Sequence, residues 1–240
     1  MTVRHPAGRV SVAIGALIAA IGAAGLARSG RPIGLTSFDG TALTAMLYEA
    51  SSRPAPGIIL VHMLGRSKDE WGGFAEHLQA AGATVLALDL RGHGNSAGNG
   101  SMLAEMVGDV RAAMDWLALR PSIRSGSLAL VGASLGANLV ANAAADAPGV
   151  RGVALLSASQ DYRGVRIDLA LMKKLSSRPV WMAASTQDPY ALRTISELSA
   201  GNAAVEQRLS TSRAHGTLLL NMDEELRRAL VDWLRRTLVF

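Results

Sequence analysis

The 240-residue sequence contains no cysteine. This absence excludes disulfides, thiolate metal ligands and a cysteine nucleophile, so covalent catalysis would require a serine or a threonine. Aromatic residues are scarce, at 4% of the chain, and the only lysines are Lys68, Lys173 and Lys174. None of the five histidines stands at the helical spacing from a carboxylate that zinc motifs use. The sequence therefore predicts no metal and no cofactor.

Positive charge is carried almost entirely by arginine, and the formal net charge is +5. Nucleic-acid binding would require a dense basic stripe with interleaved aromatic residues. Here the arginines are scattered and often adjoin acids, as in residues 223–228. We therefore predict a solvated surface and no nucleic-acid partner. With 49% hydrophobic and 18% charged residues, the chain can form a buried core.

The N-terminus has the organisation of a targeting segment. Two arginines precede an uncharged stretch, residues 10–27, and a third follows it. This pattern predicts a secretory signal cleaved near Ala27. The stretch is also about long enough to span a bilayer, so an uncleaved membrane anchor is the alternative. Both readings assign residues 1–30 to targeting, residues 31–240 to a catalytic domain, and the protein to an exported location, periplasmic or extracellular.

The remaining chain begins with an expected β-hairpin over residues 33–50 and continues with alternating strands and helices. The apolar, β-branched run 58–61 predicts a strand that is buried on both faces, and 84–88 is expected to be the next buried strand. Further strands are expected at 127–131, 153–156, 180–184 and 205–209. Amphipathic or small-residue spacing predicts helices over 71–80, 103–119, 135–145, 165–175 and 224–236.

Alternation of strands and helices forces parallel strands with helices on both faces of the sheet. We therefore predict one α/β domain, doubly wound around a mostly parallel sheet. Residues 157–179 leave room for one helix but not for a large lid domain.

A serine lies at the junction of an expected strand and an expected helix. Residues 132–136 read Gly-Ala-Ser-Leu-Gly. A serine on such a sharp turn has a strained backbone and small neighbours, and the helix start directs N–H groups towards a developing oxyanion. Ser134 is therefore the predicted nucleophile. The alternative is a small-residue packing turn without chemistry.

A serine hydroxyl needs a base, and this type of turn is followed in the chain by the acid and then the histidine. Only His215 follows the serine, so it is the predicted base, with a surface-loop histidine as the alternative. The acid should follow a strand end. Asp188 is favoured, and Pro189 is expected to delay any helix after it. Asp161, one strand earlier, is the competitor.

The second oxyanion donor is expected in the loop that follows strand 58–61, which reads His-Met-Leu-Gly. We predict that the backbone N–H groups of Leu64 and Leu135 form the oxyanion hole. His62 is expected to pack in the core and to hydrogen-bond a loop carbonyl rather than to transfer protons.

These motifs together resemble those of the α/β-hydrolase superfamily. They follow one another in the order that the family has, and the resemblance covers residues 31–240. The resembling segments are 38–40, 62–65, 89–94 and 132–136, together with Asp188 and His215. The chain is most similar to the compact dienelactone-hydrolase-like and esterase branch. It departs from the family at Met63, where a glycine is usual. Dienelactone hydrolases proper use a cysteine nucleophile, so their specific activity does not carry over.

The resemblance implies a serine hydrolase that cleaves carboxylic esters through an acyl-enzyme intermediate. Met63 and Tyr190 are expected to line a mostly apolar site, which favours short- to medium-chain acyl esters as small-molecule substrates. A thioesterase, peptidase or acyltransferase could use the same three residues. A catalytically silent, membrane-tethered binding protein is the alternative from a different class.

Overall fold

The computed structural model describes residues 1–2, 30–175, 178–200 and 202–240. The predicted signal peptide or membrane anchor lies almost entirely outside these residues, so export and anchoring remain predictions. Within the described ranges, no helix is both long and apolar enough to cross a membrane.

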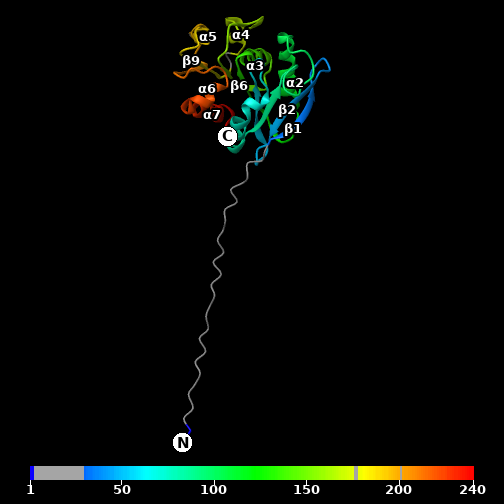
Figure 1. Ribbon diagram of the computed structural model, residues 1–240, viewed down its shortest axis with the longest axis vertical. Coiled ribbons are helices and arrows are strands. Elements are labelled where there is room, and N and C mark those ends of the chain that lie inside the picture. Colours follow the sequence, from blue (N-terminus) through cyan, green and yellow to red (C-terminus); the bar gives the residue numbers. More distant parts are fainter. Residues whose placement is uncertain (3–29, 176–177, 201) are drawn as a thin grey trace.

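The fold is built on one eight-stranded sheet with the order β1-β2-β4-β3-β5-β6-β9-β10. The strands are β1 (Arg31–Thr36), β2 (Ala42–Tyr48), β3 (Ala55–Val61), β4 (Thr84–Asp89), β5 (Ile123–Ala133), β6 (Val150–Leu156), β9 (Val180–Ser185) and β10 (Val205–Ser210). β2 pairs antiparallel with β1 and with β4, and all other neighbours are parallel. In Figure 1, β1 and β2 lie on one side of the molecule and β9 on the other. The predicted mostly parallel α/β sheet is confirmed.

Alternating side chains of the strands supply two separate cores. Ile59 and Val61 of β3 face one core, and Ile58 and Leu60 face the other. The first is covered by α2 (Met106–Ala118), α3 (Leu135–Ala145), α4 (Leu169–Leu175) and α5 (Pro189–Ser199), and the second by α1 (Gly72–Ala80), α6 (Leu218–Met222) and α7 (Glu224–Leu238). Short 3-10 turns, η1 (Lys68–Trp71) and η2 (Leu103–Glu105), precede α1 and α2. This arrangement confirms the predicted double winding.

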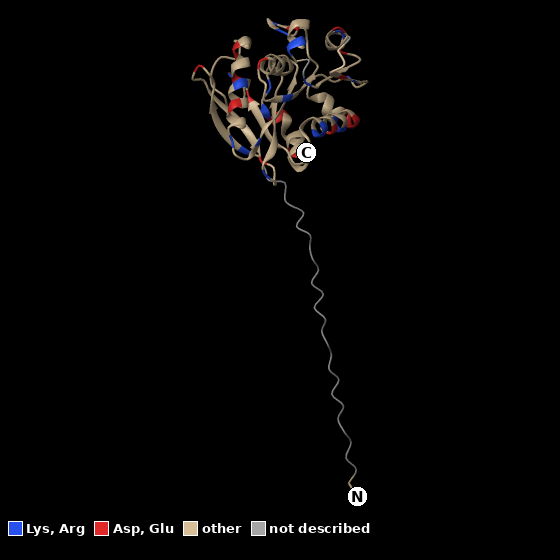
Figure 2. Ribbon diagram, turned by 180° about the vertical axis from the view of Figure 1, so that it is seen from behind, with Lys and Arg blue, Asp and Glu red and all other residues tan. Residues whose placement is uncertain are grey.

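Basic and acidic residues are interspersed along the helices, including α7 beside the C-terminus (Figure 2). Along α7, Arg228 lies 3.6 Å from Glu224 one turn earlier, and Arg236 reaches Glu206 of β10 at 3.2 Å. Exposed pairs of this kind contribute little to stability.

One predicted helix is wrong in its first turn. Residues 165–175 were expected to be helical, but Val165–Arg166 form strand β8, which pairs with β7 (Asp161–Tyr162). Arg163 and Gly164 make the turn with φ of +49° and +95°. The two left-handed residues favour a tight hairpin, because their twist matches that of paired strands. The helix, α4, begins only at Leu169.

The expected effect of Pro189 was also wrong. Proline is the first residue of α5, and Asp188 is its N-cap, with the side chain accepting from the Ala191 N–H at 3.1 Å. Proline suits this position because its missing N–H would have no helical partner there. The helix therefore starts directly at the predicted catalytic acid.

A buried ion-pair network joins the hairpin turn, the loop after β4 and the start of α2. The Arg91 guanidinium donates to both carboxylate oxygens of Asp109, and it lies 2.7 Å from Asp39 and 2.6 Å from Glu105. The Ser37 hydroxyl also donates to Asp109, at 2.7 Å. These hydrogen bonds, chiefly those to Asp109, raise the pKa of Arg91. The arginine therefore holds three segments in one arrangement.

Replacing Asp109 by alanine should lower the free energy of unfolding by about 3 kcal/mol, because it leaves a buried arginine without its main partner. Chemical denaturation monitored by circular dichroism measures this change. Asp115→Ala is the matched control, since Asp115 lies exposed on the same helix, and it should change stability by less than about 0.5 kcal/mol. Equal effects of the two variants would contradict a stabilising role for the network.

Candidate active site

Ser134 occupies a strained turn between β5 and α3, with φ of +51° and ψ of −118°. A non-glycine residue with positive φ costs about 1–3 kcal/mol. The turn is possible because the residues two positions before and after Ser134 are glycines. A Cβ on Gly132 would lie 2.2 Å from the carbonyl oxygen of Gly136, and a Cβ on Gly136 would lie 2.3 Å from the carbonyl oxygen of Val61. The spacing of the two glycines thus has a steric cause.

Hydrogen bonds connect this turn to the ends of the neighbouring strands. The Ser134 N–H donates to the Leu156 carbonyl at 2.8 Å, and the Ser157 N–H donates to the Ala183 carbonyl at 2.7 Å. The Ser157 hydroxyl accepts from the Gly216 N–H at 2.9 Å. The loop that contains His215 is therefore attached to the same sheet edge as Ser134.

His215 and Asp188 are directly hydrogen-bonded, with 2.6 Å between Nδ1 and Oδ2. The other carboxylate oxygen of Asp188 caps α5, so one side chain both starts a helix and orients the imidazole. A carboxylate on Nδ1 fixes a proton there and leaves Nε2 as the acceptor. The His215 side chain is 49% exposed and that of Asp188 is 16% exposed, so the ring lies at the surface of the site.

The competing acid has other partners. Asp161 binds the Arg166 guanidinium at 2.8 Å and the Gly164 N–H at 2.6 Å. The hydrogen bond from Arg166, followed by that from Gly164, lowers the pKa of Asp161. Its carboxylate thus stabilises the β7–β8 hairpin.

In the loop after β3, the backbone N–H of Met63 is hydrogen-bonded and that of Leu64 is not. The Met63 N–H donates to the Glu70 carboxylate at 2.9 Å. Among the residues that the structure describes, the Leu64 and Leu135 N–H groups have no hydrogen-bond acceptor. The N–H groups of both predicted oxyanion donors are thus available to a ligand, whereas the Met63 N–H is already bonded.

His62 packs in the core, as expected. Its Nδ1 lies 2.7 Å from the Met63 carbonyl oxygen, and its Nε2 lies 3.1 Å from the Leu90 nitrogen, which donates. Burial lowers the pKa of His62 to about 4. The ring therefore stays neutral near pH 7, donating through Nδ1 and accepting through Nε2. Its prediction as a structural histidine is confirmed.

Glu70 is a site residue that the sequence analysis missed. Its carboxylate binds the Met63 N–H, and the Thr217 side chain interacts with it from the loop that contains His215. Burial raises the pKa of Glu70, and these two partners oppose the rise. An acid eight residues after His62 has no distinctive spacing, so only the folded chain shows that it connects the two loops.

The two predicted substrate-binding side chains lie in different environments. Met63 is buried, and a Cβ on Gly216 would lie 2.2 Å from its sulfur. Its side chain therefore packs beneath the loop of His215. Tyr190 is 82% exposed near the start of α5. A role for either side chain in binding substrate remains a prediction.

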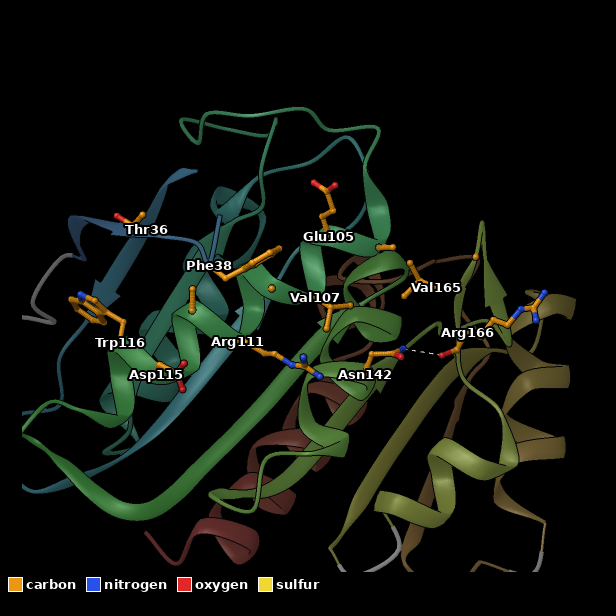
Figure 3. A pocket seen from close by; sticks show the side chains of 14 residues that line it. Thr36, Phe38, Glu105, Val107, Arg111, Asp115, Trp116, Asn142, Val165 and Arg166 are labelled. Carbon is orange, nitrogen blue, oxygen red and sulfur yellow. Dashed lines mark hydrogen bonds between the residues drawn. The ribbon is translucent and has the colours of Figure 1, made fainter. Parts of the chain in front are cut away.

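Two hollows lie on the α2 side of the molecule. The larger, of about 850 Å³, is shown in Figure 3 between α2, the β1–β2 turn and the β7–β8 hairpin, and none of the predicted catalytic residues lines it. The other, of about 470 Å³, is lined by Leu64, residues 100–105 and Arg163. The larger hollow is therefore not the predicted active site, whereas the smaller one adjoins it. Within the described residues, no cluster of three or more His, Asp or Glu side chains could hold a metal ion.

Solved structures share this architecture at low sequence identity. The esterase Pf2001 of Pyrococcus furiosus is 16% identical, with a TM-score of 0.73 over 87% of this chain and 93% of that one. The α/β-hydrolase GrgF from Penicillium sp. sh18 is 17% identical, with a TM-score of 0.75 over 88% and 99%. Est1E from Butyrivibrio proteoclasticus, solved with ferulic acid bound, is 16% identical, with a TM-score of 0.73 over 87% and 100%. These likenesses show the α/β-hydrolase fold.

Sequence comparison shows the family. No curated protein matches the chain. The model of the family described as serine aminopeptidase, S33, matches residues 52–221, well over half of the sequence. This match includes the turn at Ser134, Asp188 and His215. The chain therefore belongs to the serine aminopeptidase S33 family of α/β-hydrolases.

Proposed function

We propose that the protein is a serine hydrolase that cleaves carboxylic esters through an acyl-enzyme intermediate. The observation that supports this most directly is the 2.6 Å hydrogen bond between His215 and Asp188, beside the strained turn that presents Ser134. An imidazole oriented by a carboxylate is the usual partner of a serine nucleophile. The three residues come from three loops at the carboxyl ends of β5, β9 and β10, and only the fold brings them to one edge.

The reaction proceeds in two steps. Nε2 of His215 takes the proton from the Ser134 hydroxyl as its oxygen attacks the ester carbonyl, and the N–H groups of Leu64 and Leu135 stabilise the tetrahedral oxyanion. The intermediate collapses to the acyl-enzyme, and the leaving alkoxide takes the proton from His215. Water, deprotonated by the same imidazole, then attacks the acyl-enzyme. As the acid is released, His215 returns this proton to the Ser134 oxygen and the free enzyme is restored.

Esters are the preferred substrate class because the structural neighbour Pf2001 is named as an esterase. The name of the matching family favours peptide hydrolysis as the second candidate. Both reactions use the same intermediate, but an amine is a poorer leaving group than an alkoxide and requires protonation by His215 as it departs. Matched esters, thioesters and aminoacyl amides therefore discriminate between these activities.

A fluorophosphonate probe should label the purified protein on Ser134, because an activated serine attacks phosphorus as it attacks a carbonyl. Mass spectrometry of the digested protein locates the adduct. Ser134→Ala should remain folded and unlabelled. A folded wild type that does not react with the probe would favour the alternative of a catalytically silent binding protein.

Replacing Asp188 by asparagine should lower kcat by roughly 10³- to 10⁴-fold, because the amide stabilises the wrong imidazole tautomer. Steady-state hydrolysis of a chromogenic ester measures this change. Asp161→Asn is the comparison, since Asp161 was the competing acid and binds Arg166 instead. A larger loss of kcat in Asp161→Asn than in Asp188→Asn would reverse the assignment.

We further propose that Glu70 is a positioning residue for the oxyanion loop. Glu70→Ala should lower kcat by about tenfold or more while KM changes little, because oxyanion contacts strengthen in the transition state. Glu70→Gln keeps a carbonyl acceptor for the Met63 N–H and should recover most of kcat. Glu76→Ala, an exposed acid on α1, is the matched control. Equal losses in the two Glu70 variants, or an increase in KM alone, would contradict this role.

A further inference from the structure

The hollow next to the proposed oxyanion hole is lined by residues from three separate segments of the chain. Leu64, a proposed oxyanion donor, lines it together with residues 100–105 and Arg163. The segment 100–105 packs closely on the neighbouring loop, since a Cβ on Gly92 would lie 2.1 Å from the Gly100 nitrogen. The ring of His93 in that loop lies 5.1 Å from the ring of His62. The hollow is thus bounded by the loops that form the proposed site.

Arg163 is held at the tip of the β7–β8 hairpin in a left-handed conformation, with φ of +49°. The hairpin is attached to α3 through Asn138. The side-chain amide nitrogen of Asn138 donates to the Ser159 and Val165 carbonyls, at 2.7 Å in each case. Asn138 is fully buried and lies one turn after Ser134. The backbone of Arg163 is therefore fixed relative to the proposed nucleophile.

The acidic groups around this hollow already have cationic partners. Glu105, which lines it, lies 2.6 Å from Arg91, and Asp161, in the hairpin, binds Arg166. Arg163 forms no salt bridge within the part of the chain that the structure describes. Arg163 therefore lines the hollow as an exposed cation that is not paired with a carboxylate among the described residues.

Two further arginines flank the proposed site residues. Arg66 follows Leu64 by two positions, and Arg213 precedes His215 by two positions. Neither forms a salt bridge to any residue that the structure describes. Positive charges around a recess attract anions and increase their association rate. The charge around the site is therefore complementary to an anionic substrate.

From this arrangement we infer that the preferred substrate is an ester whose acyl part carries a carboxylate, which Arg163 binds in this hollow. The inference depends on the proposed esterase function. A guanidinium fits a carboxylate with two parallel hydrogen bonds, which gives both affinity and orientation. The apolar side chains of Leu64 and Leu103, on the same wall, would contact the methylene groups between the two carbonyl carbons.

The test compares 4-nitrophenyl monoesters of adipic and suberic acid with 4-nitrophenyl esters of neutral acids of the same chain length. The full-length protein is used, and the rate with Ser134→Ala is subtracted as background hydrolysis. The wild type should show a higher kcat/KM for the anionic esters. Because the interaction is electrostatic and partly exposed, this preference should decrease as salt concentration rises.

Three variants test whether Arg163 is responsible for the preference for anionic esters. Arg163→Gln should raise KM for the anionic esters by about tenfold and leave kcat/KM for the neutral esters unchanged. Arg163→Lys keeps the charge and should lose less. Arg151→Gln removes an exposed arginine near the start of β6, at the opposite edge of the sheet, and should not change the hydrolysis of either ester class.

The outcomes separate the two proposals. Hydrolysis of neutral and anionic esters with equal kcat/KM, or an equal effect of Arg163→Gln on both, would overturn this inference and leave the esterase proposal intact. Failure of the folded wild type to hydrolyse any of these esters or to react with the fluorophosphonate would overturn the proposed function itself.

Discussion

The site depends on a close approach between three backbone segments at the end of β5. Gly136 lies against the carbonyl group of Val61, and Gly132 lies against the carbonyl group of Gly136. Both contacts are too short to admit a Cβ on either glycine. This approach places the first N–H groups of α3 beside the loop after β3. The two proposed oxyanion donors therefore come from segments some 70 residues apart, as Leu64 and Leu135 illustrate. A larger side chain at either glycine would separate them.

The remaining residues of the proposed site are held at this sheet edge by backbone and side-chain hydrogen bonds. The Ser157 hydroxyl, at the end of β6, accepts a hydrogen bond from the Gly216 N–H. Glu70 connects the loop of Met63 with that of Thr217. Asp188 is held by its role as a helix cap. Preorganised donors and bases of this kind stabilise charge without rearrangement during reaction. The loops thus obtain their geometry from the sheet edge to which they are bonded.

The acids and the arginines around the proposed site differ in whether they have partners of opposite charge or hydrogen-bond partners. Asp188 is engaged by His215, Glu70 by the Met63 N–H and Glu105 by the buried Arg91. Several arginines are not engaged in salt bridges, Arg163 among them. The excess of arginine in the composition therefore has a local consequence, because it leaves a positively charged residue, Arg163, on the hollow that Leu64 also lines.

The sequence by itself determined the fold class and the order of the elements, because apolar runs and amphipathic spacing depend only on local residue type. It also determined Ser134 and His215 as candidates, since the Gly-Ala-Ser-Leu-Gly turn has a steric signature and only one histidine follows it. Turn chemistry was harder to read. The turn at Arg163-Gly164 led into strand β8 where the first turn of a helix was expected, and Pro189 began a helix that it was expected to delay. Only the tertiary structure decided which acid reaches His215 and that Glu70 connects two loops, because contacts between distant loops depend on distances that local sequence patterns do not contain.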